Sequence, residues 1–143
     1  MNVPNLRSPY DTVGGIVYIA RMFDKIRLNA AGQLPADYTA NLGGGFDARA
    51  CQFLHIDYPA LVTRVKQGST DDEILQWCFT QGQKPSEAEI EIWSEFLKKR
   101  GWNDSGSERL AQVAQKLPPQ WHGKIHTFFD LIEADEGRTP RCR

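Results

Sequence analysis

Residues 14–32 read GGIVYIARMFDKIRLNAAG, and this stretch constrains the structure of the chain more than any other. Apolar residues cover most faces of the helix that it would form, yet it carries four charged residues: Arg21, Asp24, Lys25 and Arg27. A helix that is apolar on most faces is normally buried, and a buried charge must be paired or used. We therefore predict a central buried helix over about residues 9–31, starting after Ser8-Pro9, a typical helix start.

A helical wheel puts the acid of this stretch between two arginines. At about 100° per residue, Arg27 falls on the apolar side. Asp24 follows about 60° further round, and Arg21 follows about 60° beyond Asp24. One carboxylate therefore lies between guanidiniums three residues before it and three residues after it. Lys25 and Tyr18 continue the same arc.

Two interpretations of these charges stay open. In the first, Asp24 pairs with Arg21 and Arg27, or the charges pair with groups on other helices, and the network is structural. In the second, three cations against one acid leave an excess of positive charge beside an apolar wall. Such a wall suits a small carboxylate or phosphate, since arginine binds these anions in a bidentate manner. Neighbouring cations would then lower the pKa of Lys25, which could act as a base or nucleophile.

Start and stop signals divide the rest of the chain into helices. Residues 70–73 (TDDE) and 86–89 (SEAE) are capping boxes, which satisfy the free amides at a helix start. The second of these helices ends in three basic residues, with Gly101 as its stop. Apolar periodicity predicts further helices over 46–56, 58–67, 104–116 and 122–134. Asp47 and Asp57 are candidate caps for the first two of these.

Glycine and proline separate the predicted helices, at residues 32–35, 43–45, 82–85 and 117–119. The sequence has no alternating apolar run of strand length and no internal repeat. We therefore predict an all-α fold, a compact single-domain bundle of six or seven helices around the central helix. The domain would span residues 1–136, and residues 137–143 would form a flexible tail.

The composition excludes several classes of protein. Seventeen basic and eighteen acidic residues give a net charge of −1, whereas a general nucleic-acid binder needs an excess of lysine and arginine. No apolar run approaches the roughly 20 residues of a membrane span, and residues 1–11 lack a signal-peptide core. We expect a cytoplasmic protein that binds neither nucleic acid nor membrane. Three widely spaced cysteines (Cys51, Cys78 and Cys142) fit reduced thiols in that compartment.

Two other patterns were weighed as sites. Gly43-Gly44-Gly45 precedes a helix but lacks the lysine and hydroxyl residue of a phosphate loop, so we interpret it as a turn. Asp47 and Arg49 follow that turn and could reach the charged helix. Three potential metal ligands, His122, His126 and Asp130, share a spacing of four residues, which would align them along one helix edge. A local pairing of His126 with Asp130 accounts for this spacing equally simply, and we expect no metal.

Four further segments look like the marks of a known family. They are LRSP (6–9), RMFDKIR (21–27), GFDAR (45–49) and KKRGW (98–102), and the segments FFD (128–130) and ADEGR (134–138) also fit. Over nearly its whole length the chain resembles an uncharacterised bacterial family labelled only as a domain of unknown function. The resemblance implies a small free-standing bacterial protein and carries no activity with it.

Two functions of different classes follow from these residues. The first is a cofactor-independent enzyme or binder for a small anionic molecule, with Asp24 and Lys25 as catalytic residues. Its ligand-binding residues would be Tyr18, Arg21, Arg27, Asp47 and Arg49, and an enzyme of this kind would be a hydrolase, lyase or isomerase using acid–base chemistry. The second is a helical interaction or regulatory module, with structural charges and a contact surface near Trp102 or Trp121. A homo-oligomer is compatible with either function.

Overall fold

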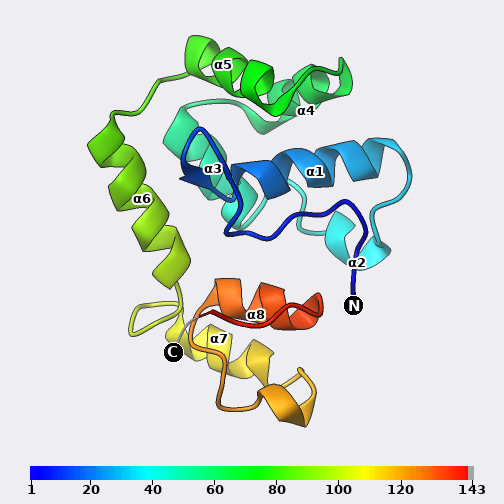
Figure 1. Ribbon diagram of the computed structural model, residues 1–143, viewed down its shortest axis with the longest axis vertical. Coiled ribbons are helices and arrows are strands. Elements are labelled where there is room, and N and C mark those ends of the chain that lie inside the picture. Colours follow the sequence, from blue (N-terminus) through cyan, green and yellow to red (C-terminus); the bar gives the residue numbers. More distant parts are fainter. Residues whose placement is uncertain (142–143) are drawn as a thin grey trace.

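The computed structural model describes residues 1–141 and confirms the all-α prediction, with eight α-helices in that range (Figure 1). The helices are α1 (Ile19–Ala30), α2 (Ala36–Thr39), α3 (Phe46–Leu54), α4 (Tyr58–Lys66), α5 (Asp71–Gln81), α6 (Glu87–Lys99), α7 (Ser107–Ala114) and α8 (Phe128–Asp135). A 3-10 helix, η1, covers Pro119–Trp121, and two short strands are β1 (Thr12–Val13) and β2 (Ile16–Val17). Cys142 lies outside the described residues, whereas Cys51 and Cys78 are buried free thiols.

Helix α1 crosses the middle of the molecule, and the other helices are arranged around it (Figure 1). Helices α3, α4 and α5 follow on one side, where α4 packs against α1. Helices α7 and α8 form the opposite end and contact each other. Helix α6 runs along the edge, where it contacts β2 and α8 and so joins the two regions.

Most of helix α1 is buried in the hydrophobic core. Every residue of α1 from Ile19 to Ile26 is buried, with Phe23 and Met22 completely so. These side chains pack against a cluster drawn from α3 to α6 and α8, which includes Leu54 and Phe129. The prediction of a central buried helix is therefore confirmed, and its charges are buried with it. No helix within residues 1–141 is both long and apolar enough to span a bilayer.

The central helix begins ten residues later than predicted, because a β-hairpin precedes it. Val13 pairs with Ile16 across a two-residue turn in which Gly14 and Gly15 have φ of 59° and 78°. Positive φ at both central residues is typical of the tight hairpin turn and breaks a helix. The amide of Tyr18 donates to the carbonyl of Pro9 at 2.9 Å, so the segment from residue 9 folds back on itself instead of forming a helix. The sequence analysis did not predict these two strands, each of which is only two residues long.

Local capping signals predicted the starts of α4, α5 and α6. Both capping boxes are present, at Thr70 and Ser86, and Asp57 caps α4 by accepting from the amide of Ala60 at 3.1 Å. Asp47 is not a cap, since Gly45 holds the N-cap position of α3. The four-residue helix α2 was not predicted.

The predicted helix over 122–134 starts six residues late. Gly123 has φ of 79°, which interrupts helical geometry, and Thr127 caps α8 by accepting from the amide of Asp130 at 3.1 Å. His122 instead ends η1, where its Nε2 lies 2.9 Å from the carbonyl of Leu117. His122, His126 and Asp130 therefore do not share one helix edge.

Candidate functional site

Arg21, on α1, is neutralised by Glu136, which directly follows α8. The two terminal nitrogens of Arg21 donate to the two carboxylate oxygens of Glu136 over 2.8 and 2.5 Å, a bidentate pair. Both residues are almost fully buried. Burial opposes the charged form of each, but the pairing outweighs burial, so the pKa of Arg21 is raised and the pKa of Glu136 is lowered. Arg21 is thus no surplus cation.

Glu136 also connects the segment after α8 to α1 and α2. The hydroxyl of Tyr38 donates to its Oε2 at 2.7 Å, and a guanidinium nitrogen of Arg138 donates to its Oε1 at 2.8 Å. Arg138 donates as well to the carbonyl of Leu6 at 2.6 Å. The guanidinium of Arg141 lies 4.4 Å from the ring centroid of Tyr10. The described start of the predicted tail therefore contacts the folded body.

Lys25, Tyr18 and Asp47 form a second buried cluster. The ammonium of Lys25 donates to the Tyr18 hydroxyl at 2.9 Å and lies 2.8 Å from Oδ1 of Asp47. The Tyr18 hydroxyl donates to that same oxygen at 2.7 Å. The second carboxylate oxygen of Asp47 accepts from the amide of Gly43 at 3.0 Å, so the triple-glycine turn helps to hold it. Three functional groups from α1, its N-cap and α3 thus meet within hydrogen-bond distance.

This environment lowers the pKa of Lys25 and raises the pKa of Tyr18. Burial is the main cause that lowers the pKa of Lys25; Asp47 opposes it, and Arg21 adds to the lowering. Burial is also the main cause that raises the pKa of Tyr18 well above its usual value, and Asp47 adds to that effect. Lys25 therefore releases its proton more readily than an exposed lysine, while Tyr18 keeps its own. The prediction that cations lower the pKa of Lys25 identified a lesser cause.

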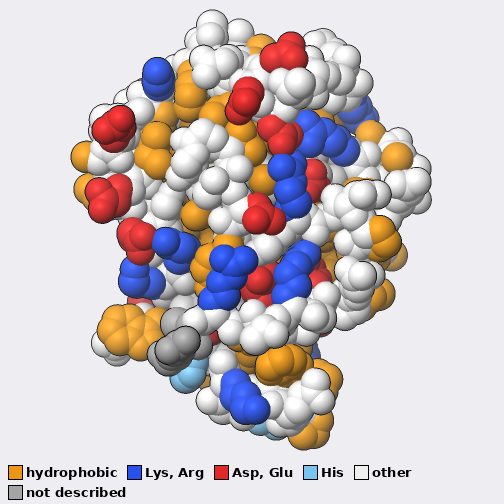
Figure 2. All heavy atoms as spheres, in the orientation of Figure 1, with side chains coloured by type: hydrophobic (Ala, Val, Ile, Leu, Met, Phe, Trp, Pro, Cys, Tyr) orange, Lys and Arg blue, Asp and Glu red, His pale blue; other side chains and the backbone are white. Residues whose placement is uncertain are grey.

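Asp24 and Arg27 lie in a separate network, with Arg7 and Asp71. Arg7 donates from Nε to a carboxylate oxygen of Asp24 at 2.9 Å, and Arg27 reaches the other oxygen only at 3.5 Å. Asp71, at the start of α5, is 2.8 Å from both Arg7 and Arg27. The face in Figure 2 shows the interleaved basic and acidic side chains of such pairs. The helical wheel puts Arg27 on the apolar side, but its side chain is 35% exposed and its guanidinium pairs with Asp71.

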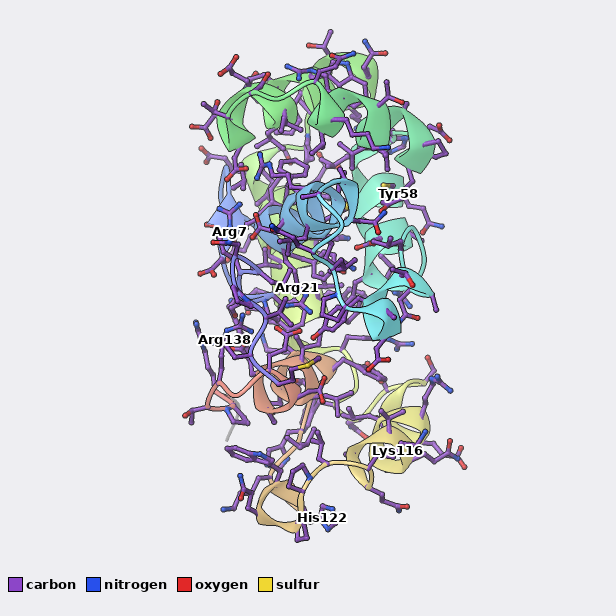
Figure 3. All side chains as sticks on the ribbon, turned by 90° about the vertical axis from the view of Figure 1, so that its right-hand side faces the viewer. Arg7, Arg21, Tyr58, Lys116, His122 and Arg138 are labelled. Carbon is purple, nitrogen blue, oxygen red and sulfur yellow. The ribbon has the colours of Figure 1, made fainter. Side chains whose placement is uncertain are left out.

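A pocket of about 560 Å³ opens on the other side of α1. Its walls come from α1, α2, α3, α7, α8 and residues next to them, and they include Tyr18, Lys25, Phe46, Arg49, Lys116 and Phe128. Figure 3 shows Arg21 between α1 and α8, with Lys116 across the gap toward the end of α7. Aromatic and aliphatic side chains from α3 and α8 make most of the lining apolar.

The pocket brings together part of the predicted site. Tyr18, Arg21, Lys25 and Arg49 line it, and Asp47 lies behind Lys25 without lining it. Asp24 and Arg27 do not line it, because their side chains turn to the network with Arg7 and Asp71. The predicted catalytic role of Asp24 has no support in this geometry, since its carboxylate is taken up by arginine and by the amide of Arg7.

The unpaired charges at the pocket are of both signs. Within residues 1–141, neither Arg49 nor Lys116 has a carboxylate within ion-pair distance; Arg49 lies instead 5.5 Å from the ring centroid of Phe96. The exposed acids Asp37 and Asp135 also line the pocket. The surplus of cations that the second interpretation requires is absent from α1, because α3, α5 and the residue after α8 supply carboxylates to Lys25, Arg27 and Arg21, as the first interpretation allows.

Metal ligation finds no support in the part of the chain that is described. No three histidine, cysteine, aspartate or glutamate side chains there are grouped to hold an ion. The backbone amide of His126 donates to a carboxylate oxygen of Asp130 at 3.0 Å, so these two residues are linked locally, through backbone rather than through the imidazole.

Comparison with protein families agrees with the resemblance read from the sequence. Residues 3–138 match the family described as DUF5069, a domain of unknown function. The chain belongs to the DUF5069 family. A search of curated proteins found no match. The family match therefore spans nearly the whole chain, but it assigns no activity to the residues of the pocket.

The sequence analysis missed three residues that this geometry makes central: Glu136, Tyr38 and Arg7. Glu136 and Arg7 lie in ADEGR and LRSP, segments quoted above for the resemblance alone. A search for the carboxylates that neutralise buried arginines would have had to consider every acid in the chain. Tyr38 carries no local signal, because its partner Glu136 is 98 residues away.

Proposed function

We propose that this member of the DUF5069 family binds a small anionic molecule, a carboxylate or a phosphate, in the pocket beside α1, and acts on it without a cofactor. The supporting observation is the cluster of Lys25, Tyr18 and Asp47, which presents a buried amine and phenol to a pocket of about 560 Å³. A pocket of this size with convergent polar groups of altered pKa is the usual form of a small-molecule site.

Arg49 is the group proposed to hold the anion, and Lys25 lines the same pocket as the reacting amine. Arg49 is half-buried and has no carboxylate partner among the described residues, so its donors are available to a ligand in the pocket. The opposing acids Asp37 and Asp135 are exposed, and solvent screens exposed charges strongly. The positive groups therefore act most strongly in the depth of the pocket and the negative groups at its rim.

Proton transfer is the chemistry that these side chains support. Lys25 is the proposed base or nucleophile, because burial lowers its pKa, and Tyr18 is the proposed proton donor, because its pKa is raised. These roles belong to acid–base enzymes, namely lyases, isomerases and hydrolases. Asp47 takes the role of a positioning residue, since it contacts both groups from behind the wall.

Binding of simple anions tests the proposal. We expect acetate, succinate or inorganic phosphate to raise the melting temperature of the wild-type protein, and isothermal titration to give its affinity. Arg49→Ala should weaken that affinity by about tenfold or more, since a charge-assisted hydrogen bond contributes about 1.5–3 kcal/mol.

Arg64→Ala is the matched control, because Arg64 of α4 bonds to the Gly68 carbonyl and the Ser69 hydroxyl in the turn after this helix and does not line the pocket. An equal loss of affinity in both variants, or no response of the wild type to any of the three anions, would refute anion binding in this pocket.

A second candidate function is a helical interaction module. It is favoured by the pairing of every charge on α1 and by Trp102, which is 60% exposed just after α6. In that case Trp102→Ala would abolish a protein contact, and Arg49→Ala would have no effect on any ligand. Sedimentation of the wild type and Trp102→Ala across a concentration series would detect self-association through this surface.

A further inference from the structure

The ammonium of Lys25 has one hydrogen that no acceptor in the described chain takes. An ammonium has three donors, and the contacts of Lys25 are the Tyr18 hydroxyl and the Asp47 carboxylate. Lys25 is only 6% exposed, so bulk water does not surround this hydrogen. Because Lys25 lines the pocket, its nitrogen borders the space that a bound molecule would fill.

The apolar part of the surroundings of this nitrogen makes the Lys25 ammonium easier to deprotonate than an exposed one, although Asp47 opposes this effect. Phe46 and Phe128 line the same pocket, and the ring of Phe46 packs edge-on against Tyr18 with centroids 5.5 Å apart. Such an apolar wall favours the neutral amine, and burial lowers the pKa of Lys25 accordingly. A desolvated lysine in an apolar pocket is the usual form of a lysine nucleophile.

Tyr18 is held in a conformation that a bulky residue seldom adopts. Its φ is 73°, in the left-handed region, at the N-cap of α1. Such strain persists only where the surrounding structure enforces it and is concentrated at functional sites. Here the strained residue places its hydroxyl 2.9 Å from the Lys25 nitrogen and 2.7 Å from Asp47.

We propose that Lys25 forms an imine with the carbonyl carbon of a 2-oxo acid bound in the pocket. This inference rests on the proposed function, because Arg49 would hold the carboxylate of the same molecule. The apolar remainder of the pocket, with Phe46 and Phe128, suits an oxo acid with a hydrophobic side chain.

The condensation balances with the groups present. Lys25 passes one proton to Asp47, and its free electron pair forms a bond to the carbonyl carbon while the carbonyl oxygen takes a proton from Tyr18. A second proton from the nitrogen then leaves with that oxygen as water, the C–O bond breaks, and the nitrogen pair forms C=N. Tyr18 recovers its proton from Asp47. The net reaction converts an ammonium and a ketone into an iminium and one water, and Asp47 again faces one positive charge.

Reductive trapping tests this step. The protein is incubated with pyruvate or phenylpyruvate and sodium cyanoborohydride, and intact mass and peptide mapping locate the adduct. We expect one adduct at Lys25, formed at least about tenfold faster than at exposed Lys84, because the pocket presents the carbonyl at high effective concentration. Tyr18→Phe should slow trapping, since the carbonyl oxygen then loses its proton donor.

Lys25→Arg keeps a cation beside Asp47 and removes the primary amine, so it should fold and lose the adduct; its circular dichroism spectrum checks the fold. Succinate binding without trapping at Lys25 would overturn the imine and leave anion binding in place. Absence of both would overturn the inference and the proposed function together. Equal labelling of Lys25 and Lys84 would also refute a pocket-held imine.

Discussion

Asp47 is the residue on which the buried charge of Lys25 depends. It is fully buried and receives the Lys25 ammonium, the Tyr18 hydroxyl and the Gly43 amide. A buried ion pair adds little stability compared with an apolar pair of similar volume. Removing one partner, however, leaves the other charge buried without compensation. The cluster is therefore costly to break at a single residue, whatever its catalytic use.

We predict that Asp47→Ala lowers the free energy of unfolding by about 3–5 kcal/mol, the usual cost of an uncompensated buried charge. Urea unfolding measures the change. Asp57→Ala is the control: like Asp47, Asp57 accepts from a backbone amide, but it is a simple N-cap without a buried cation, so a loss of about 1 kcal/mol is expected. The double variant Lys25→Met/Asp47→Leu should recover part of the loss; a double variant no more stable than Asp47→Ala would contradict the argument.

The hairpin before α1 shows how a whole element escaped the sequence analysis. The pattern over residues 16–30 is apolar on most faces, and that property is shared by a buried helix and by a short buried strand leading into one. Gly14 and Gly15 distinguish the two, because consecutive glycines at positive φ form the hairpin turn. The helical periodicity of residues 19–30 correctly predicted α1, but the predicted helix began too early, at about residue 9.

The two turn glycines give a matched pair of substitutions. In Gly15→Ala the new Cβ meets no atom within 4 Å, so only the left-handed conformation is penalised, at about 1–2 kcal/mol. In Gly14→Ala the Cβ would lie 2.5 Å from Cδ2 of Leu75, a buried core residue, which adds overpacking of about 1–3 kcal/mol. Thermal or urea unfolding should therefore rank Gly14→Ala below Gly15→Ala, and the reverse order would refute the packing of the turn on α5.

Glu136 links distant parts of the molecule and makes their association sensitive to acid. It binds Arg21 of α1, Tyr38 of α2 and Arg138 after α8. The pKa of Glu136 is lowered from its ordinary 4.5, because these hydrogen bonds outweigh burial. A lowered carboxyl pKa in the folded state contributes stability that is full above the unfolded value and is lost as the pH falls through the folded value.

We predict that wild-type stability falls more steeply below pH 4.5 than the stability of Glu136→Gln. The variant should be less stable at pH 7, where Arg21 loses its buried partner, and the two proteins should converge in acid. Urea midpoints measured from pH 7 to pH 3 give both curves. The pKa of Asp71 is also lowered, but Asp71 is present in both proteins and therefore contributes equally to their loss of stability in acid. Parallel curves throughout would show that Glu136 does not carry this dependence.

Capping signals at the starts of α4, α5 and α6 were predictable from the sequence. The capping boxes at Thr70 and Ser86 and the N-cap at Asp57 join groups three residues apart, and all three are present. The burial of α1 also follows from its own composition, because an apolar surface on most faces has to be removed from water wherever the helix lies. The sequence likewise identified Tyr18, Arg21, Lys25 and Arg49 as candidates, and all four line the pocket.

The partners of these charges were settled only by the folded chain. Asp24 is three residues from Arg21, yet Arg21 binds Glu136, 115 residues away, and Lys25 binds Asp47 of another helix. An ion pair depends on the distance between two charges in space and on their burial, and the chain can bring together residues of any separation. The same local pattern of Arg21, Asp24, Lys25 and Arg27 was therefore compatible with a surplus of positive charge and with complete pairing. The packing of α3, α5 and α8 around α1 selected pairing and left the pocket beside Lys25.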